Sequence, residues 1–451
     1  MNCSHVIPQL RKLEQKYHQE LVVVGVEAGK FPAERVTANV RQAVLRLGIE
    51  HPVVNDRHFR LWRSYSVDAW PTIVLIDPEG RVLDERAGEI TFETLDPAIA
   101  DVVRDGEARG TLDRQPLPFI QPACRSEPER PLAFPGKVLA ASDNRLFIAD
   151  SDHHRVLIVA LEASGETGQV QQIVGSGQAG LADGDFASAA FHYPQGLALA
   201  DDVLYVADSE NHAVRAVDLR AQRVRTVAGT GQQAHGFDLA GPGPRTALNS
   251  PWDVVVVDRG LYVAMAGTHQ LYRVDLSSDD IRLYAGSGVE DLVDDLLIGC
   301  AFAQPMGLTT DGRRLYVACG ESSAVRWVDL PPGDHAGTIV GTGLFDDGDR
   351  DGEGDAVLLQ HDQGVTWADD HLYVADTYNN KVKLVDPATR RATTLFGSAT
   401  PGDRDGVAPL FYEPGGIDVV GNRLYIADTN NHAIRVADLA TGRVATLALR
   451  F

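Results

Sequence analysis

One short apolar sequence motif occurs six times in the last two thirds of the chain. It consists of Leu, an aromatic residue, Val or Ile, Ala and a variable fifth residue, and successive copies lie 52 to 58 residues apart. Runs of β-branched and aromatic residues between turns predict buried β-strands. The copies are Leu146–Asp150, Leu204–Asp208, Leu261–Met265, Leu315–Cys319, Leu372–Asp376 and Leu424–Asp428.

Three further strand patterns accompany each copy. In the second unit they are the run Pro194–Leu199, the alternating run His212–Asp218 and the shorter run Val224–Gly229. Four antiparallel strands in each of six units predict a six-bladed β-propeller, because stacked blades bury faces that one blade leaves exposed. The propeller is expected over residues 134–451, with Val444–Leu449 as its last strand, and the sequence leaves open how the ring closes.

The most specific sequence pattern of the repeat lies in the turn after the second strand. Asp208–Arg215 and Asp428–Arg435 both have the pattern Asp-Ser/Thr-x-Asn-His-x-Val/Ile-Arg. This sequence pattern resembles the NHL repeat, and the resemblance covers residues 134–451. It implies a propeller that presents a surface for a protein partner or a small ligand.

The first hundred residues follow a different, alternating α/β pattern. Residues 3–17 have helical periodicity, and Leu21–Val26 is a continuous apolar run that is typical of a strand in a parallel sheet. A second helix is expected from Phe31 to Gly48, followed by an apolar segment from His51 and a helical stretch to Tyr65. Ile73–Asp77 and Arg81–Asp84, joined by a turn, predict a hairpin.

This order resembles the thioredoxin-like fold of the redoxin type, over residues 1–110, with residues 111–133 as a linker. The resemblance places Trp70-Pro71 in that family's cis-proline loop and Cys3 at the second, resolving position of its Cys-x-x-Cys motif. The attacking cysteine and the central strand of the sheet would then precede Met1. We therefore expect Met1 to be an internal codon, and thiol–disulfide oxidoreductase activity to require the upstream cysteine. The whole arrangement resembles one group of fusion proteins, the NHL repeat-containing protein 2 type.

Composition narrows the functional classes. Lys and Arg number 41 against 63 Asp and Glu, and the formal net charge is −22, so a binder of nucleic acid or of an anionic membrane is not expected. No apolar run approaches the ~20 residues of a spanning helix. The cysteines Cys3, Cys124, Cys300 and Cys319 are scattered, which favours neither a zinc knuckle nor a disulfide framework and fits a reducing cytoplasmic location.

The propeller offers several candidate site residues. Histidines follow the second strand in four units, where they either pin the turn or line one face of the ring, and three histidines at the channel could hold zinc. Two units depart from the repeat with a Met or a Cys in place of Asp, and such departures can mark a site. The segment Asp347–Gly352 resembles a calcium loop, but Leu358 stands where the loop needs Glu, so an inter-blade turn is expected. The candidates on the propeller face are His154, His212, His269, His432, Met265 and Cys319, and no metal or cofactor is assigned.

The leading functional hypothesis is thiol–disulfide exchange by the first domain on whatever the propeller recruits. The catalytic candidates are Cys3, Trp70 and Pro71. The alternatives are a non-catalytic scaffold in which both modules bind proteins and, more weakly, a metal-dependent lyase or hydrolase in the propeller channel.

Overall fold

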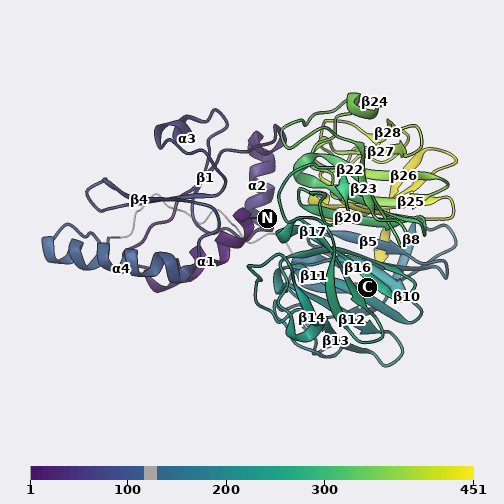
Figure 1. Cartoon of the computed structure of the whole chain (residues 1–451), viewed down its shortest axis with the longest axis horizontal. Helices are drawn as coiled ribbons and strands as arrows, with labels where there is room; N and C mark the ends of the chain where they lie inside the picture. Colours follow the sequence, from purple (N-terminus) through teal and green to yellow (C-terminus); the bar gives the residue numbers. More distant parts are fainter. Residues whose placement is uncertain (1, 116–129) are drawn as a thin grey trace. The chain divides into compact units, whose positions relative to one another are not determined.

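The computed structural model describes residues 2–115 and 130–451 and divides the chain into two compact units, Met1–Pro128 and Glu129–Phe451 (Figure 1). Cys124 and residues 116–129 of the expected linker lie outside the described residues. None of the helices in the described ranges combines the length and apolar character that a membrane crossing requires.

The first unit has the predicted thioredoxin-like fold. Two helices at opposite ends of the unit's sequence pack together, and the core between them contains Leu13, Tyr17, Leu95 and Ile99. Phe92–Arg109 was not among the expected helices. The elements in chain order are α1 (Asn2–Lys16), β1 (Gly25–Glu27), the 3-10 helix η1 (Ala33–Arg35), α2 (Thr37–Arg46), β2 (Val53–Asn55), α3 (Arg60–Ser64), β3 (Thr72–Ile76), β4 (Val82–Ala87) and α4 (Phe92–Arg109).

The β-structure of this unit consists of two separate pairs. β1 pairs with β2 in parallel and β3 pairs with β4 antiparallel, and within the described residues no strand occupies the other edge of β1 or β3. Val22, Val24 and Val26 are about half exposed, at 51%, 50% and 47%. The apolar run that would be covered in a continuous sheet is therefore open to solvent.

Two of the expected elements differ from the structure. The strand expected at Leu21–Val26 begins only at Gly25, because its first ladder bond runs from the Gly25 N–H to the Pro52 carbonyl and its partner strand starts at Val53. The helix expected from Phe31 to Gly48 is two helices, because Val36 is extended (φ −82°, ψ 120°) and separates η1 from α2.

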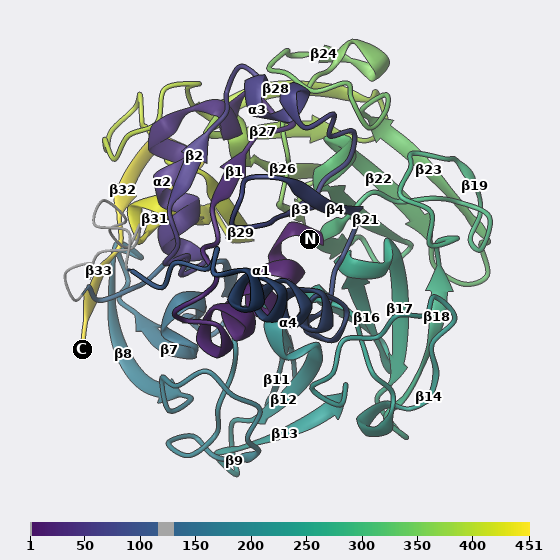
Figure 2. The same cartoon turned by 90° about the vertical axis from the view of Figure 1, so that its left-hand side faces the viewer.

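The second unit is the predicted six-bladed propeller, and Figure 2 shows its strands disposed around a ring. In each blade four strands run antiparallel from the channel outwards. In blades 2 to 5 the connection that precedes the innermost strand adds a short outer strand.

The blades are made of the following strands. Blade 1 has β5 (Lys137–Ala140), β6 (Arg145–Asp150), β7 (Arg155–Leu161) and β8 (Thr167–Val174); blade 2 has β9 (Gly184–Asp185), β10 (Pro194–Ala200), β11 (Val203–Asp208), β12 (Ala213–Asp218) and β13 (Arg223–Ala228); blade 3 has β14 (Ala240–Pro242), β15 (Pro251–Val257), β16 (Gly260–Met265), β17 (Gln270–Asp275) and β18 (Asp280–Ala285). Blade 4 has β19 (Asp295–Leu296), β20 (Pro305–Thr310), β21 (Arg314–Cys319), β22 (Ala324–Asp329) and β23 (His335–Val340); blade 5 has β24 (Gly352–Glu353), β25 (Gly364–Ala368), β26 (His371–Asp376), β27 (Lys381–Asp386) and β28 (Arg391–Gly397); blade 6 has β29 (Pro414–Val420), β30 (Arg423–Asp428), β31 (Ala433–Asp438) and β32 (Arg443–Thr446).

Glycine in the repeated Pro-x-Gly step lets the innermost strands approach the channel closely. A Cβ added at Gly196 would lie 2.4 Å from the Asp253 Cα, and one added at Gly416 would lie 2.6 Å from the Lys137 Cα. Real Cβ atoms do not approach other carbons so closely. The close spacing of adjacent blades therefore requires glycine at this position. The same spacing positions the residues at the mouth of the channel.

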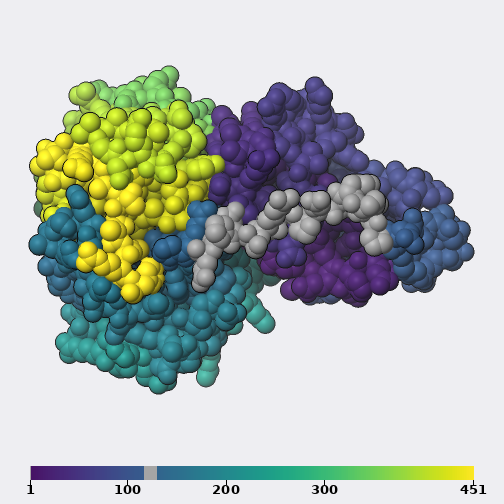
Figure 3. All heavy atoms as spheres, turned by 180° about the vertical axis from the view of Figure 1, so that it is seen from behind, coloured from purple at the N-terminus to yellow at the C-terminus, as the bar shows by residue number. Residues whose placement is uncertain are grey.

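The C-terminal residues close the ring. The run expected as one strand, Val444–Leu449, is divided at the buried Leu447: β32 completes blade 6, and β33 (Ala448–Arg450) pairs in parallel with β8 of blade 1. Figure 3 shows these last residues, in yellow, against the blue residues of blade 1. Leu447 lies in a core cluster formed by blades 1 and 6. Its side chain is therefore packed in the seam, the junction between the two ends of the propeller.

Leu447→Ala should destabilise the propeller by about 2–5 kcal/mol, because it leaves a cavity in this seam. The matched control is Val407→Ala, since Val407 is 78% exposed and its loss should change stability by no more than about 0.5 kcal/mol. The measurement is urea-induced unfolding followed by circular dichroism. Equal midpoints for the two variants would show that the seam does not hold the ring.

Candidate functional site

The four histidine candidates of the propeller all make the same contact between blades. Each side chain accepts a hydrogen bond from a backbone N–H that precedes the innermost strand of the next blade, and Ser323 and Asn380 replace histidine in the other two blades. The six bonds span 2.9–3.3 Å and join Tyr193 to His154, Ser250 to His212, Gln304 to His269, His361 to Ser323, Glu413 to Asn380 and Phe134 to His432.

This contact explains the histidine position in structural terms. All six residues are left-handed, with φ between 47° and 57°, and that conformation turns the side chain towards the next blade. Burial lowers the pKa of His432 to about 4, which keeps Nδ1 available as an acceptor. The histidines are distributed over separate junctions, and no three His, Cys, Asp or Glu side chains in the described ranges are grouped as metal ligands.

The carboxylate of the Asp at the end of the second strand is engaged in a hydrogen bond and an ion pair. Asp208 is fully buried, accepts the His192 N–H at 2.7 Å and pairs with the Arg215 guanidinium at 2.9 Å. Arg215 continues outwards to Asp183, at 2.8 Å, on the edge of the blade. The Asp of a recurring Asp-Gly turn thus pairs with a cation of the third strand, as Asp405 does with Arg435.

The two departures from this pattern have different consequences. In blade 3, Met265 and Tyr272 replace the Asp and Arg together, so that blade contains no buried ion pair at this level. In blade 4 only the Asp is replaced: Cys319 is fully buried, and Arg326 keeps its outer partner Asp294 at 2.9 Å. Burial raises the pKa of the Cys319 thiol to about 12, so this thiol is not a nucleophile at neutral pH.

A third departure was not singled out from the sequence. Asp362 replaces the proline of the Pro-x-Gly step in blade 5, is fully buried, and neither of its carboxyl oxygens has a hydrogen-bond partner in the part of the chain that is described. Burial and the nearby charge of Asp376 raise the pKa of Asp362 well above its usual range. The preceding His361 is left-handed (φ 52°), as are the residues before the five prolines. The backbone is therefore already shaped for proline.

A lysine crosses the propeller channel. Lys137 of blade 1 is buried, and its Nζ lies 3.1 Å from Asp253 Oδ2, 2.8 Å from the Met306 carbonyl and 2.6 Å from the Gln363 carbonyl. These partners belong to blades 3, 4 and 5, so the ammonium group lies where a channel metal ion would be repelled. The sequence contained a signal for this pair, because Lys137 and Asp253 both replace the glycine of the Pro-x-Gly step.

The thioredoxin-like unit holds the three catalytic candidates on two elements. Cys3 is exposed in the first turn of α1, whereas Trp70 and Pro71 form the segment that enters β3. The Trp70–Pro71 peptide bond is cis. The Trp70 indole N–H donates to the Ala28 carbonyl at 2.8 Å, and its ring packs on Trp62 of α3 with the centroids 4.5 Å apart. This loop is thereby fixed to the end of β1.

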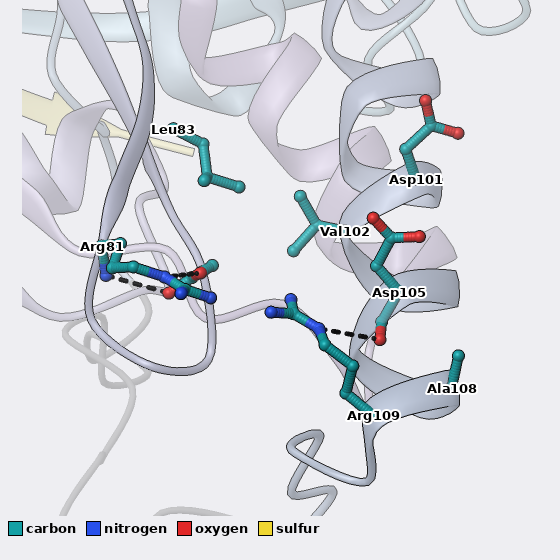
Figure 4. Close-up of a pocket in the computed structure, with 8 residues that line it drawn as sticks. Arg81, Leu83, Asp101, Val102, Asp105, Ala108 and Arg109 are labelled. Carbon is teal, nitrogen blue, oxygen red and sulfur yellow. Dashed lines mark hydrogen bonds and ion pairs between the residues drawn. The ribbon is translucent and has the colours of Figure 1, made fainter.

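A cleft of about 600 Å³ lies between the β3–β4 hairpin and α4 (Figure 4). Leu83, Val102 and Ala108 supply its apolar wall. Its charged groups are largely paired, as in the Arg109–Glu79 contact at 2.9 Å. The residues that line the cleft include no cysteine and no histidine.

Comparison with known proteins agrees with this architecture. Residues 1–82 match a thioredoxin-like family model, and residues 191–216 and 411–437 match the NHL repeat. Human NHL repeat-containing protein 2 is 39% identical over 490 residues, which cover 100% of this chain and 66% of that protein. The Arabidopsis thaliana protein SUPPRESSOR OF QUENCHING 1, chloroplastic, is 39% identical over 100% of this chain and 44% of its own length.

The chain belongs to the thioredoxin-like/NHL-repeat fusion family. It spans about two thirds of the length of the bovine and human relatives. The thioredoxin-like part is also 31% identical over 94 residues to the thiol-disulfide oxidoreductase ResA of Bacillus anthracis, covering 21% of this chain and 52% of that protein.

Replacing His432 by Asn should make propeller stability less dependent on pH. His432 has a depressed pKa in the folded state, so its contribution is present above the unfolded pKa of ~6.5 and is lost as the pH falls towards 4. Asn380 makes the same contact with its Oδ1, so His432→Asn keeps the acceptor and removes the titration. The wild type should lose up to about 2 kcal/mol more than the variant between pH 7 and pH 4.5, after allowance for solvent screening. The measurement is urea unfolding at several pH values; parallel pH profiles would contradict the assigned role.

Replacing Asp362 by Pro should stabilise the propeller by about 1–3 kcal/mol, because it removes an unsatisfied buried carboxyl group and restricts the unfolded chain. Asp362→Ala is the matched control and should give only the part of the gain that comes from removing the carboxyl group. Thermal unfolding of the three proteins measures both effects. A lower melting temperature for Asp362→Pro would indicate that the carboxyl group has a partner that stabilises the fold.

Proposed function

We propose that this protein carries out thiol–disulfide exchange on proteins that its propeller binds. The observation that carries the proposal is an exposed thiol in the first turn of α1 of a thioredoxin-like unit, in which the Trp70 loop is fixed to the end of β1. The B. anthracis relative ResA is named a thiol-disulfide oxidoreductase, which supports the same chemistry for this unit.

The resemblance puts Cys3 at the resolving position, so an intramolecular dithiol cycle would require a further cysteine before it. Exchange through a mixed disulfide requires only Cys3 and one external thiol. The Cys3 thiolate attacks one sulfur of a disulfide in the bound protein; the new Cys3–sulfur bond forms as the substrate S–S bond breaks, and the departing sulfur takes up a proton. A low-molecular-weight thiol then attacks the sulfur bonded to Cys3, which releases the Cys3 thiolate and leaves the external thiol in a disulfide with the fragment that Cys3 had carried. The first turn of a helix favours the thiolate, because the backbone N–H groups there are unpaired and partially positive.

The arrangement of the propeller supports a role in binding. The histidine and aspartate positions of the repeat are engaged between or within blades, and Lys137 lies across the channel. Cys300 and Cys319 are both buried, and burial raises the pKa of both thiols. The outer surface and the loops are then the parts of the propeller that contribute to function.

A non-catalytic scaffold is the second candidate. It is favoured by the open edges of β1 and β3, since exposed strand edges and exposed valines are features that a docking module can use. In that case Cys3 is one surface residue among others, and its replacement changes no activity.

The test uses the whole chain with a fluorescent peptide that carries a glutathione mixed disulfide, in the presence of reduced glutathione. The wild type should accelerate the release of the peptide thiol, and Cys3→Ser should lower the rate at least tenfold, towards the uncatalysed value. Cys300→Ser is the control, because that thiol is buried and bonded to the Leu297 carbonyl at 3.1 Å.

Mass spectrometry of the trapped intermediate identifies the reacting residue. An adduct on Cys3 that is absent from Cys3→Ser supports exchange at this position. No acceleration by the wild type, with no adduct at Cys3, would reject the proposal in favour of the scaffold.

A further inference from the structure

The departure from the repeat in blade 3 rebuilds the loop that precedes that blade. Tyr272 stands where four other blades have a buried Arg or Lys, and its hydroxyl group bonds to the Phe237 carbonyl and accepts the Leu239 N–H at 3.4 Å. In blades 2, 5 and 6 the corresponding loop is held by an Asn side chain of the turn after the second strand, as in the 2.7 Å bond from Asn211 to the Gly180 carbonyl. Blade 3 thus replaces a turn contact by a tyrosine contact that fixes the backbone at Phe237.

The side chain at this fixed position lies on the propeller surface beside the next loop. Phe237 is 51% exposed, and a Cβ added at Gly288 would lie 2.6 Å from its Cδ1. The preceding junction has the same arrangement, because a Cβ added at Gly231 would lie 2.7 Å from Leu181 Cδ2. Gly231 and Gly288 both have positive φ, 82° and 85°, so glycine at these points permits both the turn and the overlying side chain.

Two further exposed apolar residues lie in the loops that precede blades 4 and 5. Val289 directly follows Gly288 and is 58% exposed, and Phe345, in the loop that precedes blade 5, is 74% exposed. We name these four residues the apolar arc: Leu181, Phe237, Val289 and Phe345. Exposed apolar side chains that occur at successive junctions, rather than singly, mark an interaction surface.

Carboxylates accompany the arc. Asp238 follows Phe237, Asp291 is two residues from Val289, and Asp346 follows Phe345. Within residues 2–115 and 130–451 none of these three carboxylates takes part in an ion pair, whereas Asp183 and Asp294 of the same loops are paired with Arg215 and Arg326. The arc therefore combines apolar contact area with negative charge that the chain does not neutralise.

We propose that the apolar arc binds a basic, amphipathic segment of a protein partner, in which apolar residues alternate with lysine or arginine. The apolar side chains of the segment would cover Phe237, Val289 and Phe345, and its cations would pair with Asp238, Asp291 and Asp346. The occupant follows from charge complementarity, since the surface is acidic and the whole chain has a net charge of −22. This inference rests on the partner-binding part of the proposed function and is independent of Cys3.

The test measures binding of a fluorescein-labelled Lys/Leu amphipathic peptide to the full chain by fluorescence anisotropy, with Glu/Leu and Lys/Ser peptides of the same length as comparisons. The Lys/Leu peptide should bind at least tenfold more tightly than either comparison. The triple variant Phe237→Ser, Val289→Ser, Phe345→Ser should weaken binding at least tenfold. The triple variant Asp238→Asn, Asp291→Asn, Asp346→Asn should weaken binding and reduce its dependence on salt.

The control variant is Val407→Ser, because this side chain is exposed and lies in the loop that precedes blade 6, which carries no residue of the arc. It should bind the Lys/Leu peptide as the wild type does, and melting temperatures should confirm that all variants are folded. Equal affinity of the wild type and the arc variant, or equal loss in the control variant, would overturn the inference. Cys3→Ser should bind normally, so a failure of thiol exchange and a failure of the arc give different results.

Discussion

The propeller depends on one hydrogen bond that is repeated at every junction between blades. A left-handed residue after the second strand offers a side-chain acceptor to a backbone N–H of the next blade, at 2.9–3.3 Å. Histidine, serine and asparagine all serve, so the requirement is for an acceptor at a fixed backbone conformation and not for imidazole chemistry. Burial that lowers the pKa of His432 to about 4 is what this requirement predicts, because a histidine protonated at Nδ1 cannot accept the bond.

This bond also decides which parts of the molecule are free to act. Most junctions use their turn residue, their Asp and their Pro-x-Gly step for packing, so these repeated positions are not free to serve another function. The departures from the repeat have distinct results: Lys137 and Asp253 together close the channel, Tyr272 holds a loop that presents Phe237, and Asp362 leaves an unsatisfied buried carboxyl group. Of these three, the second fixes a loop that carries an exposed side chain. The first places a buried ion pair in the channel, and the third leaves a buried carboxyl group without a hydrogen bond in the described residues.

The sequence was sufficient for the elements that repeat and insufficient for those that depend on a distant partner. Six copies of one sequence motif predicted six blades, and the structure has six blades. The division of the last run at Leu447 could not be foreseen, because the run is uniformly suited to a strand and only the meeting of blades 6 and 1 assigns its two halves to different sheets. In the same way β1 begins at Gly25 because its partner strand begins at Val53. For the candidate histidines, the pattern indicated a shared role, but the acceptor bond requires the neighbouring blade. Lys137 and Asp253 were visible as departures at one repeat position, yet their attraction depends on the diameter of the ring.

The thioredoxin-like unit differs from the propeller in that strand edges of its sheet stay open in the described residues. In the propeller the pairing of β33 with β8 leaves the ring closed, whereas β1 and β3 each keep one edge without a strand in the described residues. Val22, Val24 and Val26, in and before β1, are about half exposed. Burying apolar surface contributes roughly 25 cal/mol per Å², so the stability of this unit is sensitive to whatever covers these side chains. Local opening is expected to be easiest where few apolar contacts form, which places it at β1. β1 is also the element whose end holds Trp70, so a chain segment that covered its free edge would fix the cis-proline loop at the same time. The stability of the sheet and the geometry of the proposed exchange site are therefore one property of this unit.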